Sequence, residues 1–145
     1  MNRFYALIVV LVVALGHSGA AIAQNFIAPQ TSVGLAVSKN LDIDETEDAV
    51  KTAAGQLYGY YLFNRSTSEV RYFKFYDGLV ADVVVGTTAP VMVLAVPANS
   101  AANVFTDIGL HAFTTAITVA CTTGVLDDDT GAPGTNDCVG NIYYK

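Results

Sequence analysis

Basic side chains and histidine are scarce in this chain. Seven Lys and Arg stand against thirteen Asp and Glu, and 145 residues contain only two histidines. A domain with this balance repels phosphate backbones, and no basic stripe or arginine cluster offsets the repulsion. The composition therefore argues against nucleic-acid binding.

The sequence also lacks a recognisable catalytic constellation. A lone histidine such as His111, in a strand-like segment, is more often a surface residue than a general base, and no oriented nucleophile accompanies it. No glycine-rich phosphate loop precedes a helix, and nothing in the sequence sets two carboxylates at the separation that glycoside hydrolysis needs. We expect no catalytic or cofactor-binding residues and no enzyme activity. A hydrolase is the alternative if His111 or a carboxylate pair reaches a cleft.

The N-terminal apolar run is too short for a membrane-spanning helix. Residues 1–23 are typical of a signal peptide, with Arg3, an apolar run over Leu7–Leu15 and the cleavage motif Ala21–Ala23. No stop-transfer pattern follows, so we expect export to the periplasm or beyond and no stable membrane anchor after cleavage before Gln24. An uncleaved anchor or a misassigned start codon are the alternatives.

The remaining chain is long enough for one domain with a single core. Loss of Arg3 makes its net charge one unit more negative than the −6 of the whole chain. Residues 24–48 mix short apolar pieces with an acidic cluster, and we expect an N-terminal arm or irregular segment there, with the cluster in a solvated turn.

Residues 49–145 show an all-β pattern, in which short β-branched and aromatic runs are separated by turn-forming residues. The expected strands are Ala49–Thr52, Gln56–Asn64, Glu69–Tyr76, Val91–Val96, Ala102–Thr106, Gly109–Phe113, Ala116–Thr122 and Cys138–Tyr144. About eight short strands in so small a domain require two packed sheets. We predict an antiparallel β-sandwich, jelly-roll-like if the connections are Greek keys, with a small β-barrel as the alternative.

Two local expectations follow from the aromatic strands. The polar segment Arg65–Ser68 separates two aromatic-rich runs, and a β-hairpin is the simplest connection between them. Alternation in the second run should point Phe73 and Phe75 into the core and Lys74 outward.

The stretch from Cys121 to Cys138 holds both cysteines and three consecutive aspartates. If the strands that flank it pair with each other, the sulfurs can meet across the mouth of the loop, so we expect a disulfide, with free thiols or a metal pair as alternatives. Asp127 and Asp129 in a glycine-ended loop suit calcium, but the flanking helices and distal glutamate of an EF-hand are absent. A solvated or Asx-bonded turn is the preferred interpretation, with no metal.

Four tyrosines, Tyr58, Tyr60, Tyr72 and Tyr76, lie in the two aromatic strands. Exposed tyrosines are common at contact surfaces, so these four are a candidate contact face for a glycan or a protein partner. The alternative is that half of them fill the core or rim of the sandwich.

The order of these elements resembles a group of small virion-associated β-sandwich proteins encoded by tailed bacteriophages and prophages. The resemblance covers about the last 95 residues, and only the order of its elements is moderately specific. The matching segments are Gly55–Gly59, Arg71–Tyr76, Pro90–Pro97, Thr115–Val119, Asp127–Pro133 and Tyr144-Lys145.

The resemblance implies a phage structural protein of the head-decoration, fibre or tail-accessory class. Such a module binds a protein shell, whether capsid, tail or cell-surface assembly, and forms a homo-oligomer such as a trimer. The signal peptide and the two cysteines depart from the pattern. They fit the alternative of an exported surface or periplasmic binding module built on the same fold, while the phage-type structural module is the first interpretation.

Overall fold

The computed structural model describes residues 34–145; the predicted signal peptide and the first part of the predicted arm lie outside this range. The described residues form nine strands and no helix. The strands are β1 (Ala36–Ile43), β2 (Asp48–Lys51), β3 (Gly55–Asn64), β4 (Arg71–Asp77), β5 (Met92–Val96), β6 (Ser100–Phe105), β7 (His111–Phe113), β8 (Ile117–Thr122) and β9 (Cys138–Tyr144).

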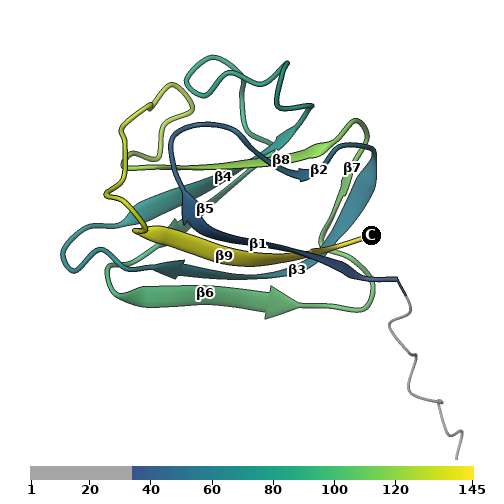
Figure 1. The fold of residues 1–145 in the computed structure, drawn as a ribbon, viewed down its shortest axis with the longest axis horizontal. Helices are drawn as coiled ribbons and strands as arrows, with labels where there is room; N and C mark the ends of the chain where they lie inside the picture. The colour runs from purple at the N-terminus through teal and green to yellow at the C-terminus, as the bar shows by residue number, and fades with distance from the viewer. Residues whose placement is uncertain (1–33) are drawn as a thin grey trace, which may run out of the picture. The chain divides into compact units, whose positions relative to one another are not determined.

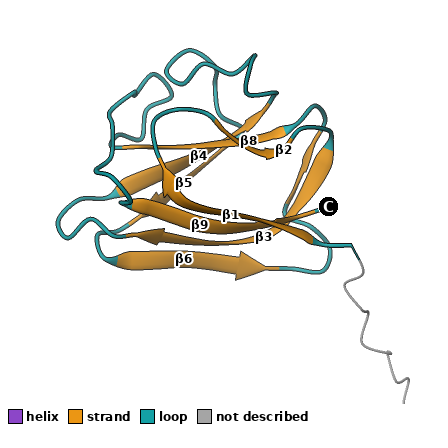
Figure 2. Cartoon of the chain, viewed as in Figure 1, coloured by secondary structure: helices purple, strands orange, loops and turns teal. Residues whose placement is uncertain are grey.

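The strands make two antiparallel sheets that pack face to face (Figures 1 and 2). Sheet A has the order β1-β9-β3-β6, with β7 also paired to β3, and sheet B has the order β2-β8-β4-β5. The pairs β1·β9, β2·β8, β3·β6 and β4·β5 are nested in the sequence, as in one long hairpin folded over itself. This nesting is the jelly-roll topology, so the predicted sandwich is confirmed and no closed barrel forms.

The core lies between the inner faces of the two sheets. Sheet A contributes Leu57, Leu62 and Ile142, and sheet B contributes Phe73 and Phe75, all at most 1% exposed. In β4, Phe73 and Phe75 reach the core by period-two alternation, because every second residue of a strand points to the same face. The expected inward orientation of Phe73 and Phe75 is therefore confirmed.

All eight predicted strands are present, with ends shifted by at most a few residues. The ninth strand, β1, lies within the segment that we expected to be an irregular arm. It pairs with β9 along its length, from Ala36 opposite Tyr144 to Ile43 opposite Cys138. Its sequence, AVSKNLDI, mixes Lys, Asn and Asp with apolar residues, because an edge strand with one solvated face needs few buried side chains.

The predicted β-hairpin between the two aromatic strands is wrong. β3 belongs to sheet A and β4 to sheet B, so Arg65–Ser68 carries the chain from one sheet to the other. Asn64, which is fully buried, supports this corner: its amide nitrogen donates to the carbonyl oxygens of Glu69 and Val96 at 2.7 and 2.9 Å. The sequence of a polar turn does not distinguish such a corner from a hairpin.

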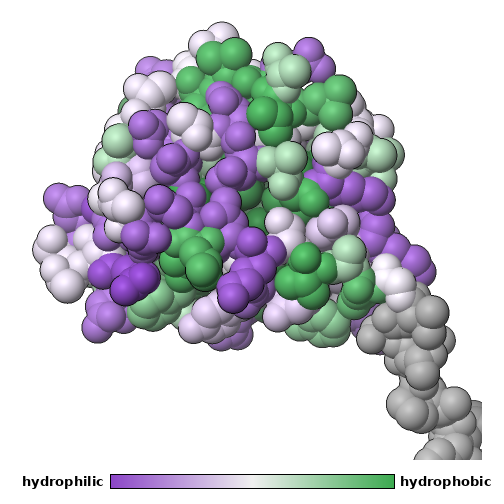
Figure 3. Space-filling view, in the orientation of Figure 1, coloured by the Kyte–Doolittle hydropathy of each residue, from purple (hydrophilic) through white to green (hydrophobic). Residues whose placement is uncertain are grey.

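Two long connections cover the outer face of sheet B. Val83 and Val85, between β4 and β5, pack with Tyr76 and Ala120 in a second small cluster. Hydrophobic side chains gather at the top of Figure 3, where Figure 1 places the β4–β5 connection. Sheet B is therefore covered on both sides, and all six residues of β8 are buried.

Candidate functional site

The predicted disulfide between Cys121 and Cys138 is confirmed. Both residues are fully buried, and their Cα atoms are 6.5 Å apart. The pair differs from the expected geometry in one respect: Cys121 lies in β8 of sheet B and Cys138 begins β9 of sheet A. The bond therefore links the two sheets of the sandwich, and it fits an oxidising compartment.

Asp129 organises the acidic loop within this disulfide. Its Oδ1 atom accepts hydrogen bonds from the backbone N–H groups of Gly124 at 2.9 Å and Gly131 at 3.1 Å. Partial burial raises the pKa of the Asp129 carboxyl, but these bonds and the Lys74 ammonium outweigh burial, so the net pKa is lowered. Asp129 thus holds the loop in an Asx-bonded conformation.

Lys74 is the cation at the centre of the loop. Its side chain leaves the outer face of sheet B, as alternation predicted, but it is fully buried under the loop and does not reach solvent. The Nζ atom donates to the carbonyl oxygens of Leu126 at 2.6 Å and Asp129 at 3.1 Å. Burial lowers the pKa of Lys74, and the carboxylates of the loop oppose that shift.

Lys74 thus points outward from the sandwich as predicted, but it does not reach solvent, because a loop more than fifty residues away in the sequence covers it. The residues considered for calcium are used differently by the protein. Asp127 lies in the exposed part of the loop, whereas the Asp129 carboxylate is bound to backbone N–H groups. Within residues 34–145 no three His, Cys, Asp or Glu side chains come together as a metal site.

Arg71 attaches the far end of the same loop to sheet B. The guanidinium of Arg71 donates to Oδ2 of Asp137 at 2.8 and 3.2 Å and to Oε2 of Glu69 at 2.8 Å. Burial lowers the pKa of Arg71, but the two carboxylates outweigh it and the net pKa is raised. Asp137 directly precedes Cys138, so the ion pair and the disulfide hold adjacent residues.

The four tyrosines proposed as a contact face do not form one. Tyr72 and Tyr76 belong to sheet B, whereas Tyr58 and Tyr60 belong to sheet A. Tyr76 is fully buried beneath the β4–β5 connection. Burial, with smaller contributions from Glu47 and Asp127, raises its pKa to about 12, so the phenol stays neutral at physiological pH.

In sheet A, a β-bulge separates Tyr58 from Tyr60. The register of β3 against β9 shifts between Leu57 and Gly59. Tyr60 consequently packs against the core, and burial raises its pKa. Tyr58 donates to Oε1 of Gln56 at 3.2 Å. Two of the four tyrosines, Tyr60 and Tyr76, therefore pack inside the domain, which is the alternative considered from the sequence. In sheet A the bulge is the cause.

His111 has no partner suited to catalysis among the contacts of the described residues. Its ring packs edge-on against Phe113, with the ring centroids 4.8 Å apart. No side-chain hydrogen bond to His111 is formed within residues 34–145, and the neighbouring Ala112 is exposed. The residue is a half-buried part of the β7 strand.

An exposed aromatic surface lies on the outer face of sheet A, and it is formed by other residues than the four tyrosines suggested by the sequence. In the register, Gly59 of β3 lies between Phe105 of β6 and Tyr143 of β9. The two rings meet edge-to-face with centroids 5.6 Å apart. A Cβ atom on residue 59 would lie 2.6 Å from the backbone oxygen of Val104 and 2.9 Å from Cδ2 of Phe105, so only glycine fits at this position.

The next row on this face has a tyrosine between two amides. Tyr61 pairs with Asn103 on one side and with Asn141 on the other. Tyr61 is 42% exposed and Phe105 is 60% exposed. We call the two rows formed by Phe105, Gly59, Tyr143, Asn103, Tyr61 and Asn141 the aromatic face.

A shallow groove of about 420 Å³ lies on the β6 side of the aromatic face. Its lining residues are Tyr60, Tyr61, Asn103, Val104, Phe105 and Tyr143. None of them is charged. The sequence could have indicated this groove, because Gly59, Tyr61 and Phe63 alternate with Tyr58 and Tyr60, but only the bulge decides which set faces outward.

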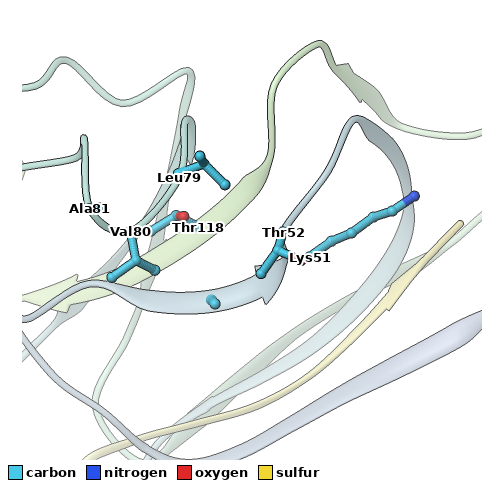
Figure 4. A pocket seen from close by; sticks show the side chains of 7 residues that line it. Lys51, Thr52, Leu79, Val80, Ala81 and Thr118 are labelled. Atoms are coloured by element: carbon cyan, nitrogen blue, oxygen red, sulfur yellow. The ribbon is translucent and has the colours of Figure 1, made fainter.

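A second, smaller hollow of about 240 Å³ lies against sheet B, beside β2. It is lined mainly by small or aliphatic side chains, including Ala49, Leu79 and Val80. Figure 4 shows the side chain of Lys51 extending away from Leu79 and Val80, so the lysine ammonium does not face the hollow. The only other polar side chains that line this hollow are those of Thr52 and Thr118.

Comparison with known proteins gave no similarity: no family model, no curated protein and no solved structure matches this chain. Among the described residues, no helix has the length and apolar character needed to cross a membrane.

Proposed function

We propose that this chain is an exported, non-enzymatic binding module that attaches to a larger surface through the aromatic face of sheet A. The periplasm or the cell exterior is its proposed location. The inter-sheet disulfide supports export, because such bonds persist in oxidising compartments.

The aromatic face is the single observation that carries this proposal. Large exposed aromatic side chains at adjacent positions are unusual on a free surface and are enriched where proteins bind partners. Phe105 at 60% exposure and Tyr61 at 42% lie on strands held by a stapled sandwich. Such a face is rigid before binding, so little conformational entropy is lost when a partner binds.

The test uses the purified, disulfide-bonded protein with a fluorescent label. It is mixed with isolated cell envelopes of the bacterium that carries the gene, and the pellet is measured after centrifugation. We expect the wild type to co-sediment and the double variant F105A/Y61A to stay in solution. The matched control is L126A, an equally exposed aliphatic position at 67% on the loop over sheet B. Equal sedimentation of wild type and double variant contradicts the proposal.

A phage-type decoration or fibre module, binding a capsid or tail shell as a symmetric homo-oligomer, is the second candidate. The fold favours it, since nested antiparallel pairing in two sheets is the jelly roll that viral shell proteins also use. This support is an analogy of fold, which many functions share. Native mass spectrometry should show a trimer that adds to purified capsids or tails, and a monomer with no affinity for either contradicts this candidate.

A further inference from the structure

We propose that the aromatic face binds a neutral glycan chain. This inference rests on the proposed function and names the class of ligand for the same surface.

The register places ring and amide groups next to each other on the outer face of sheet A. Phe105 and Tyr143 meet above Gly59, and one row away Tyr61 lies between Asn103 and Asn141. A sugar ring has an apolar face of C–H groups and an edge of hydroxyls. The aromatic rings can pack against the first, and the amides and phenol hydroxyls can hydrogen-bond with the second.

The face is uncharged although the domain is strongly acidic. The chain has thirteen Asp and Glu against seven Lys and Arg, yet no Asp, Glu, Lys, Arg or His lines the groove. Lys39, opposite Asn141 in β1, is the one charged neighbour in this register row. The groove has no carboxylate lining it that could bind a cationic partner, and this register row has only one lysine that could bind an anionic polymer. A neutral ligand matches the face best.

The size of the face is too small for a stable pair of protein surfaces. The aromatic face is only part of the outer face of sheet A, whose path of four strands about 4.8 Å apart, with about six residues along each, covers roughly 400 Å². A standard protein interface buries about 800 Å² on each partner. A narrow chain needs far less area, and the groove of about 420 Å³ beside Phe105 lies within the range of ligand pockets.

The experiment is affinity electrophoresis in native gels that contain one polysaccharide each: a β-glucan, a xylan, an α-glucan, a galactomannan, or alginate as the acidic arm. The proteins are wild type, F105A, Y61A, N103A and the control L126A. Each variant is first shown to retain its disulfide by mass and its cooperative thermal transition. Phe105 and Tyr61 are both partly exposed, so their truncation leaves the core intact.

We expect at least one neutral polysaccharide to retard the wild type and L126A. F105A and Y61A should weaken that retardation at least tenfold and N103A severalfold. Retardation by alginate alone, by no polysaccharide, or equally for wild type and F105A overturns the glycan inference.

Failure of this inference differs from failure of the proposed function. If envelopes retain the wild type but not F105A/Y61A, and protease treatment of the envelopes abolishes binding, the face binds a protein and the glycan inference is wrong. Self-association of the wild type that F105A abolishes, measured by analytical ultracentrifugation, likewise assigns the face to a second copy. Binding that survives protease and is lost after periodate oxidation of the envelopes supports the glycan.

Discussion

The Lys74 ammonium donates a hydrogen bond of 2.6 Å to the carbonyl oxygen of Leu126, 52 residues further along the chain. A second bond reaches the carbonyl oxygen of Asp129 at 3.1 Å. The acidic loop between the two cysteines is therefore built around a cation that the protein itself supplies. A lysine in this place also explains why the loop can fold over sheet B despite its three consecutive aspartates.

Replacing Lys74 by Met should destabilise the domain. The variant removes the ammonium donor from the carbonyl oxygens of Leu126 and Asp129. Leu126 keeps a hydrogen bond from the Asp129 N–H group at 3.0 Å, whereas Asp129 loses its bond from the ammonium, and we expect a cost of about 1–3 kcal/mol. Urea denaturation measures the loss, and hydrogen exchange should show faster exchange in the loop. The control K39M alters an exposed lysine of β1 and should change the unfolding free energy by less than about 0.5 kcal/mol. Equal stability of the two variants contradicts the role assigned to Lys74.

The disulfide should resist reduction in the native protein and stabilise it strongly. Both sulfurs are buried, and the cysteines are 17 residues apart in the sequence. A loop of this length contributes about 3 kcal/mol through the unfolded chain. The double variant C121A/C138A should therefore unfold at a lower urea concentration, while the native wild type keeps its bond in a phosphine reductant. Rapid native reduction would show that the sheets open more easily than the structure indicates.

Of the two ion pairs that Arg71 forms, we expect the pair with Asp137 to contribute much more to the free energy of unfolding than the pair with Glu69. R71M leaves Asp137 unpaired in a partly buried position, where its side chain is 19% exposed, and we expect a loss of about 3 kcal/mol. Glu69 serves as the comparison, because its side chain is 64% exposed and its ion pair with Arg71 is solvated. E69Q should lower the free energy of unfolding by less than about 1 kcal/mol. Equal losses in the two variants would contradict this asymmetry.

Asp77 should make the stability depend on pH at the acidic end. Burial raises its pKa, but hydrogen bonds from Thr114, Thr115 and Ala116 outweigh burial and lower it from 3.8 to about 2. A carboxyl with a depressed folded pKa stabilises fully above its unfolded value and loses that contribution as the pH falls through its folded value. The unfolding free energy should therefore fall between about pH 4 and pH 2.

The variant D77N removes this titration. It should be less stable than the wild type at pH 7, and its unfolding free energy should decline less between pH 4 and pH 2. The matched control is D107N, because Asp107 is exposed and accepts no side-chain hydrogen bond among those of the described residues. Parallel pH profiles for wild type and D77N, measured by urea titration, would contradict the role of Asp77 as the acceptor for the β7–β8 turn.

The sequence predicted eight of the nine described strands because strands depend on short-range patterns. It predicted the disulfide for another reason, because two cysteines allow only one intramolecular pair. Alternation identified Phe73 and Phe75 as core residues, and turn-forming residues marked the strand ends. Contacts between distant segments were not visible. Nothing near Lys74 in the sequence shows that a loop will cover it, and nothing near Arg65 shows that the chain changes sheets there.

The aromatic face was missed for a different reason. Tyr58 lies in the bulge between Leu57 and Gly59, and one extra residue there reverses the face that each later side chain of β3, including Tyr61, occupies. The sequence offers no sign of that bulge. The Phe105 and Tyr143 rings also meet only because β6 and β9 flank β3 on opposite sides and because Gly59, between them, has no side chain.

The position of β9 determines when this domain can fold. β9 comes last among the described strands, yet it lies inside sheet A, between β1 and β3. Until the ribosome has released residues 138–144, β1 has no neighbour and β3 lacks its longest pairing partner. Sheet A therefore cannot be completed before β9 has been synthesised, and a nascent chain without β9 exposes the unpaired strand edges of β1 and β3.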